Sequence, residues 1–92
     1  MERSEIIQIV KTEIAAVLER EPSDFDEEEN LLKLGVPSIK VIKIINQIRR
    51  RLEVDINPVA LFEYKTIGEF AAYLEDALLE LEEEAEEQHV DR

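Results

Sequence analysis

Ser38 is the residue whose surroundings most suggest chemistry, because it stands between Leu-Gly-Val-Pro and a strongly apolar run in "LLKLGVPSIKVIKII", residues 31–45. A nucleophilic serine needs a base held beside its hydroxyl. The only histidine, His89, lies in an acidic stretch far along the chain, which disfavours a Ser-His-Asp site. Two readings of Ser38 remain: a helix cap, or a surface hydroxyl that accepts a covalent group.

Other catalytic and metal-binding chemistry is poorly supported. The 92 residues include no cysteine, which excludes disulfides, thiolate metal sites and thiol nucleophiles. With 23 acidic residues, chance carboxylate pairs are inevitable, and no particular pair stands out. The glycine-centred pattern of a calcium loop is missing. The sequence therefore predicts neither an enzyme nor a metal site.

The charge is strongly acidic overall but basic around Ser38. The formal net charge is -12, whereas residues 31–57 hold 6 basic and 2 acidic side chains. Such acidity argues against binding a nucleic-acid backbone. The sequence has neither an apolar run of about 18 residues nor a signal-peptide pattern at its start. We therefore expect a cytoplasmic protein that binds neither nucleic acid nor membrane.

Two long helices are expected to flank Ser38 in the sequence. Apolar spacing predicts the first from about Ser4, as N-cap, to Glu19. The second runs from about Ser38 to Leu52, with Val41, Ile45, Ile48 and Leu52 on one face. The opposite face carries Lys40, Lys43, Gln47 and Arg50, together with an exposed Ile39 directly beside Ser38.

A short helix and a fourth, longer one complete the prediction. Pro58 can begin the short helix, in which we expect Val59, Leu61 and Phe62 to be buried. Thr66 and Glu69 form a capping box for the last helix, which should end near Leu81. Residues 82–92 lack apolar periodicity and are expected to be a disordered acidic tail beyond a domain of residues 1–81.

The long connection over residues 21–37 should be pinned to the helices. Loops of this length in compact domains are usually functional or packed by their own side chains. We expect Phe25 and at least one of Leu31, Leu32 and Leu34 to be buried. The predicted fold is all-α, with three longer helices, one short helix and this long first loop.

The stretch "ENLLKLGVPSIKVIKIINQIRRRLEVDINPVALFEYKTIGEFAAYL" resembles acyl and peptidyl carrier proteins. The shared features are Leu34-Gly35, Ser38, Leu61-Phe62 and Thr66-Ile67, in that order. The resemblance implies a four-helix carrier bundle in which 4'-phosphopantetheine is attached to Ser38 through a phosphodiester. Acyl groups would then be carried as thioesters on the thiol of that arm. The family usually has Asp before the serine, whereas this chain has Pro37.

The basic second helix is more similar to polyketide or mixed polyketide–peptide synthase carriers than to the acidic carriers of fatty-acid synthesis. The resemblance implies that Ile39, Lys40, Lys43 and Arg50 contact a phosphopantetheinyl transferase and acyl-handling enzymes such as an acyltransferase or a ketosynthase. We expect a monomer unless the chain is part of a larger synthase. The alternatives for the whole chain are a peptidyl carrier, an unmodified adaptor, or a small acidic protein that binds partners through its basic centre alone. The alternative for the basic face is that it is merely solvated.

Overall fold

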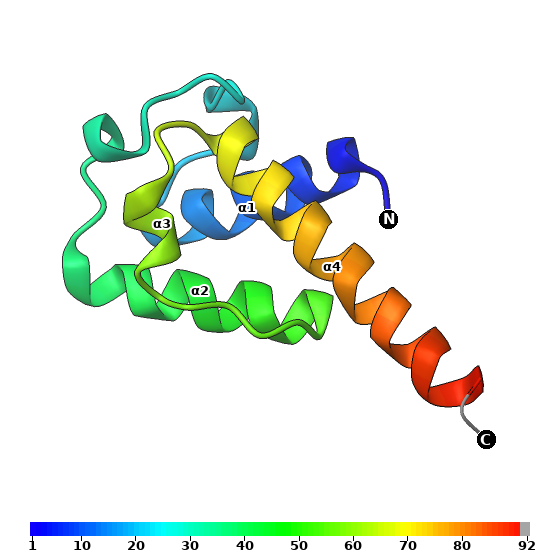
Figure 1. Ribbon diagram of the computed structural model, residues 1–92. Coiled ribbons are helices and arrows are strands. Elements are labelled where there is room, and N and C mark those ends of the chain that lie inside the picture. The colour runs from blue at the N-terminus through cyan, green and yellow to red at the C-terminus, as the bar shows by residue number, and fades with distance from the viewer. Residues whose placement is uncertain (91–92) are drawn as a thin grey trace.

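The computed structural model describes the backbone of residues 1–90 and the side chains of residues 1–83. Four α-helices and two 3-10 helices follow one another: α1 (Arg3–Leu18), η1 (Pro22–Asp24), η2 (Leu31–Leu34), α2 (Ser38–Leu52), α3 (Ala60–Glu63) and α4 (Ile67–Val90). No strand occurs in residues 1–90, and the only bridge pairs Asn30 with Thr66. The predicted all-α fold, with three longer helices and a short one, is confirmed (Figure 1).

The core forms where α1, α2 and α4 meet, because each of these helices carries an apolar stripe. The prediction that Val41, Ile45, Ile48 and Leu52 share the inner face of α2 is confirmed, since all four are buried. Burial of a large aliphatic side chain contributes about 1.5–3 kcal/mol. The largest fully buried side chains are Ile6, Val10 and Ile14 of α1, Ile44, Ile45 and Ile48 of α2, and Ile67, Phe70 and Leu74 of α4.

Helix starts follow capping chemistry, although not always at the expected residue. Thr66 and Glu69 cap α4 as predicted: the Glu69 N–H donates to Thr66 Oγ1 at 3.1 Å, and the Thr66 N–H donates to Glu69 Oε2 at 3.1 Å. The prediction of Ser4 as the N-cap of α1 is wrong. The cap is Glu2, whose N–H donates to Glu5 Oε1 at 3.4 Å, so the helix begins at Arg3.

The short helix α3 exposes more apolar surface than expected. Leu61 is buried, but Val59 is 53% exposed and Phe62 is 49% exposed, so the predicted burial of these two residues is wrong. A helix of four residues makes about one turn and therefore presents only one side to the core. Ala60 and Leu61 occupy that side.

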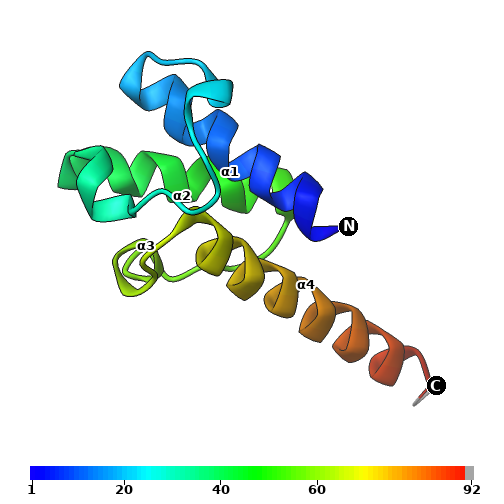
Figure 2. The same cartoon turned by 90° about the horizontal axis from the view of Figure 1, so that it is seen from above.

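Helix α4 extends beyond the expected end near Leu81 and continues to Val90 (Figure 2). Residues 82–90 are rich in glutamate and contain alanine, which are strong helix formers and can prolong a helix without an apolar face. An ion pair between Arg3 and Glu75, at 2.8 Å, places the start of α1 beside the middle of α4. The predicted domain boundary at residue 81 stays a prediction, and residues 91–92 lie outside the described chain.

None of the helices in the described chain combines the length and the apolar character needed to cross a membrane.

Candidate functional site

Ser38 is the first helical residue of α2, and Pro37 is the N-cap. Pro37 has an extended backbone (φ −60°, ψ 141°), and its carbonyl accepts hydrogen bonds from Lys40 N–H at 2.8 Å and Val41 N–H at 3.2 Å. These two bonds close the first turn of the helix without any side chain. Proline suits this place because its lack of an N–H costs nothing where the chain enters a helix.

The alternative that Ser38 simply caps its helix is therefore wrong. Its side chain is exposed, and its hydroxyl makes no hydrogen bond within the part of the chain whose side chains are described. A hydroxyl with no structural partner is open to an enzyme that approaches from solvent. An exposed hydroxyl at a helix start is compatible with the second reading, a surface group that accepts a covalent group.

The turn that delivers the chain to Ser38 depends on Asn30 and Gly35. The Asn30 side chain caps η2 by accepting from Leu32 N–H at 2.9 Å, and Gly35 ends η2 with φ 73°. This left-handed conformation is accessible to glycine but strained for most other residues. Leu34-Gly35 thus forms the turn that ends η2 shortly before the helix.

The loop that leads to Ser38 is fastened to the start of α4. Leu31 N–H donates to the Lys65 carbonyl at 2.9 Å, and Gly68 N–H donates to the Glu27 carbonyl at 2.8 Å. Phe25 and Leu31 are 3% and 8% exposed, which confirms the prediction that the loop is pinned by apolar side chains. The site is therefore held by packed structure on both sides.

The four residues proposed beside Ser38 all face solvent, as expected. Ile39 is 80% exposed, and Lys40, Lys43 and Arg50 are exposed along the same helix. Their neighbours are already paired: Arg49 lies 3.0 Å from Asp55, and Arg51 lies 3.0 Å from Glu13. Among the side chains described, Lys40, Lys43 and Arg50 have no such ion pair, so their charges are available to a partner.

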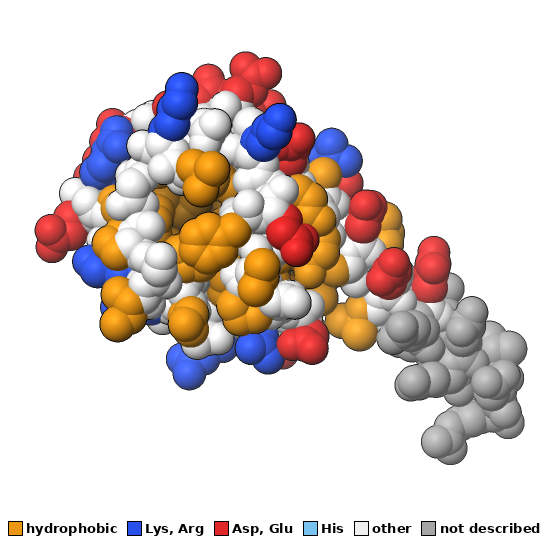
Figure 3. All heavy atoms as spheres, turned by 60° about the vertical axis from the view of Figure 1, so that its left-hand side comes forward, with side chains coloured by type: hydrophobic (Ala, Val, Ile, Leu, Met, Phe, Trp, Pro, Cys, Tyr) orange, Lys and Arg blue, Asp and Glu red, His pale blue; other side chains and the backbone are white. Residues whose placement is uncertain are grey.

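Several exposed apolar residues lie near Ser38; the exposure of Ile39 was predicted from the sequence, whereas that of Ile42, Val59 and Phe62 was not. Figure 3 shows hydrophobic side chains gathered on the side of the molecule where η2, α3 and the start of α2 lie, with Lys and Arg around them. The helical spacing of Ile42 from Ile39 is a signal that could have revealed it. A one-turn helix has no readable periodicity, so Val59 and Phe62 gave none. The exposed apolar residues of these elements, together with the N-cap of α3, are Leu32, Ile39, Ile42, Val59 and Phe62.

The first turn of α2 fits a negatively charged group on Ser38. The N–H groups of Ser38 and Ile39 donate to no backbone carbonyl in the described chain, and no acidic residue occupies this turn. Free N–H groups and the positive end of the helix dipole favour a phosphate there, typically by about 0.3–1 kcal/mol at an exposed site. The residues present therefore suit a phosphodiester on the serine oxygen.

Catalytic and metal-binding arrangements are missing from the same region. Within residues 1–83, no three His, Cys, Asp or Glu side chains lie together as metal ligands. The side chain of His89 lies outside the described residues. Among the described side chains, the Ser38 hydroxyl makes no hydrogen bond to a base.

Comparison with known proteins relates the chain to a described family. The family model described as "Phosphopantetheine attachment site" matches residues 8–74, a range that includes Ser38. The polyketide synthase PksL of Bacillus subtilis (strain 168) is 39% identical over 51 residues, covering 55% of this chain but only 1% of PksL. The chain thus spans about one hundredth of that relative.

A small relative and a solved structure extend the comparison over most of the chain. The polyketide biosynthesis acyl-carrier-protein AcpK of Bacillus subtilis (strain 168) is 32% identical over 77 residues, covering 83% of this chain and 94% of AcpK. The NMR structure of the HMG-ACPI domain from the CurA module of Lyngbya majuscula aligns with a TM-score of 0.75 at 27% identity. That alignment covers 84% of this chain and 78% of the domain.

Proposed function

Because the chain belongs to the family of carrier domains with a phosphopantetheine attachment site, we propose that it carries acyl intermediates of polyketide assembly on Ser38. Members of this family are carriers and not enzymes. The observation that carries the assignment of the serine is its exposed hydroxyl, free of hydrogen bonds, at the start of α2.

The attachment transfers phosphopantetheine from coenzyme A to the serine oxygen. The bond from Ser38 Oγ to phosphorus forms as the diphosphate bond of coenzyme A breaks, adenosine 3',5'-bisphosphate leaves, and the serine proton is released. Because the Ser38 hydroxyl makes no hydrogen bond to a base among the described side chains, the base that accepts its proton would come from a phosphopantetheinyl transferase. The attached arm would supply a thiol that holds acyl groups as thioesters.

The partner surface is proposed to consist of Ile39, Lys40, Lys43 and Arg50, extended by the exposed apolar residues Ile42, Val59 and Phe62. An apolar centre with a charged rim is the usual anatomy of a protein interface. The partners would be the transferase and acyl-handling enzymes of a polyketide synthase, such as an acyltransferase or a ketosynthase. These enzymes should present acidic groups around an apolar contact. The cytoplasm, where a synthase would work, is the proposed location.

Intact mass after incubation with coenzyme A and a broad-specificity phosphopantetheinyl transferase tests the assignment. We expect the addition of one phosphopantetheine, and we expect Ser38→Ala to block it. Because the hydroxyl caps nothing, Ser38→Ala should change the free energy of unfolding by less than about 0.5 kcal/mol. The loss of loading is then not caused by unfolding.

Ser23→Ala is the matched control, because Ser23 is also exposed but lies in η1. It should load as the wild type does. Unchanged mass of the wild-type protein with every transferase tried would favour an unmodified adaptor with a carrier-like fold.

A further inference from the structure

The outer face of α2 carries a shallow hollow of about 330 Å³ that begins directly beside Ser38. Its near end is apolar, and its far end offers positive charge and amide N–H donors. No carboxylate lines it. The lining residues are Ile39, Ile42, Lys43, Asn46, Gln47 and Arg50, and we call this site the α2 hollow.

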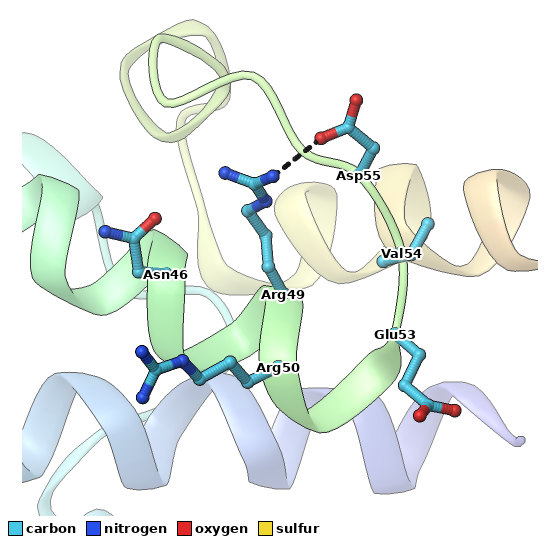
Figure 4. A pocket seen from close by; sticks show the side chains of 6 residues that line it. All are labelled: Asn46, Arg49, Arg50, Glu53, Val54 and Asp55. Atoms are coloured by element: carbon cyan, nitrogen blue, oxygen red, sulfur yellow. Dashed lines mark ion pairs between the residues drawn. The ribbon is translucent and has the colours of Figure 1, made fainter.

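Arg50 supplies a positive charge that the protein does not use elsewhere. Whereas Arg49 is held by Asp55 at 3.0 Å, Arg50 has no ion pair among the described side chains. Figure 4 shows the Arg50 guanidinium directed back along α2 toward the start of the helix, while Glu53 points the other way. Helical side chains generally lean toward the helix N-terminus, so the charge of Arg50 is displaced toward Ser38.

A group carried on Ser38 is long enough to reach this charge. Arg50 follows Ser38 by twelve residues, which is about 18 Å along a helix. A phosphopantetheine arm has a main chain comparable to about five residues of extended peptide, or roughly 18 Å. An acyl group continues a few bonds beyond the thiol. Its far end can therefore meet Arg50 without complete extension of the arm.

We propose that the α2 hollow binds a carboxylate at the far end of the acyl group, with Arg50 as the main contact and Lys43 beside it. The inference rests on the proposed function, because it requires a loaded Ser38. Ile39 and Ile42 lie under the apolar part of the chain, and the guanidinium of Arg50 pairs with the carboxylate oxygens. The substrate class is thus acyl groups that end in a carboxylate.

A site this open works only because its ligand is tethered. An exposed ion pair raises the population of the docked form by no more than about fivefold. A short flexible tether, however, gives an effective concentration on the order of millimolar. The free dicarboxylate at micromolar concentration should therefore leave the spectrum of the protein unchanged, whereas the tethered one should not.

Two acyl groups of equal length, glutaryl and pentanoyl, test the proposal because only glutaryl ends in a carboxylate. Each is loaded from its coenzyme A thioester by a broad-specificity transferase, and intact mass confirms the loading. Proton–nitrogen NMR spectra of the two forms are then compared. We expect glutaryl alone to shift the backbone amides of residues 43–50 and the Arg50 Nε–H, and we expect high salt to remove the difference.

Variants of two cations on α2 separate the site from general charge. Arg50→Gln should abolish the glutaryl-specific shifts, whereas Arg51→Gln should keep them, because Arg51 is exposed on the same helix but does not line the hollow. Identical glutaryl and pentanoyl spectra on loaded protein would overturn this inference and leave the proposed function standing. Failure of the mass to increase would overturn both.

Discussion

At Pro37 the extended backbone directs the carbonyl toward the N–H groups of Lys40 and Val41, and this fixes what Ser38 can do. The main chain alone closes the first turn, so the serine hydroxyl is left without a structural task. A side chain with no such task can be modified at little cost in folding. The geometry around Pro37 thus separates the stability of α2 from the chemistry of Ser38.

Replacing Pro37 by Asp tests whether the missing carboxylate matters. Aspartate is a favoured N-cap worth about 0.5–2 kcal/mol, but loss of the proline frees the unfolded chain by about 0.4–1 kcal/mol, so stability should change little. A transferase that reads an Asp before the serine should load Pro37→Asp faster. The measurement is a loading time course by mass for both proteins.

Pro37→Asn is the control, because it keeps the capping ability without the charge. If Asn gives the same acceleration as Asp, then capping and not the carboxylate is responsible. Equal rates for all three proteins would mean that transferases tolerate proline at this position and that the departure from the family pattern is irrelevant.

Among the elements, the long first loop shows the clearest contrast in burial between neighbouring side chains. Leu31 is 8% exposed, and Leu32 is 72% exposed. Leu31→Ala should reduce the free energy of unfolding by about 2–5 kcal/mol, since it leaves a cavity under the loop. Leu32→Ala should change it by less than about 0.5 kcal/mol. Urea denaturation of both variants measures the difference, and equal losses would show that the loop is not pinned by Leu31.

The elements that could be predicted from sequence were those with a repeating apolar pattern. The bounds of α2 were predicted as Ser38 to Leu52 and found there, because its apolar residues recur with a clear period and Leu52 closes the pattern. The burial of Val59 and Phe62 was predicted wrongly, because one helical turn contains too few residues to show a period. The N-cap of α1 was misplaced because Glu2 is a weaker capping signal than Ser4.

Deletions at the C-terminal end of α4 test where the stable domain ends. Leu74 is buried, whereas Leu79 and Leu81 are about half exposed and Glu82 and Glu83 are exposed. Deleting residues 82–92 should therefore lower the melting temperature by less than about 4 °C, equivalent to less than about 1 kcal/mol. Deleting from Leu74 onward, as a control, should unfold the protein. A loss of 10 °C or more for the shorter deletion would mean that residues beyond 81 pack.

At the scale of the whole molecule, the exposed charge of α2 is opposite in sign to the net charge of the protein. The protein has a net charge of -12, yet α2 exposes Lys40, Lys43 and Arg50 next to Ser38. The acidic remainder should repel acidic partner surfaces, and the outer face of α2 should attract them. A partner would thereby be oriented before contact, with its apolar residues meeting Ile39 and Ile42. The position of this basic face could be inferred from the sequence, because the positions of the charged residues and the helical period both indicate it. The exposed apolar surface beside it on α3 could not be inferred from the sequence.

Reversing Lys40, Lys43 and Arg50 to Glu tests this arrangement at the scale of the molecule. The change should slow acyl transfer with an acyl-handling enzyme of the same synthase about tenfold at low salt, because association loses its electrostatic steering. High salt should reduce the difference in transfer rate between the variant and the wild type. Reversing Lys11, Lys33 and Lys65 alters the net charge equally but leaves α2 intact, so it should slow transfer much less. Circular dichroism would verify that both variants remain helical. Equal slowing by the two triple variants would mean that only the net charge counts, and that the outer face of α2 has no special part in recognition.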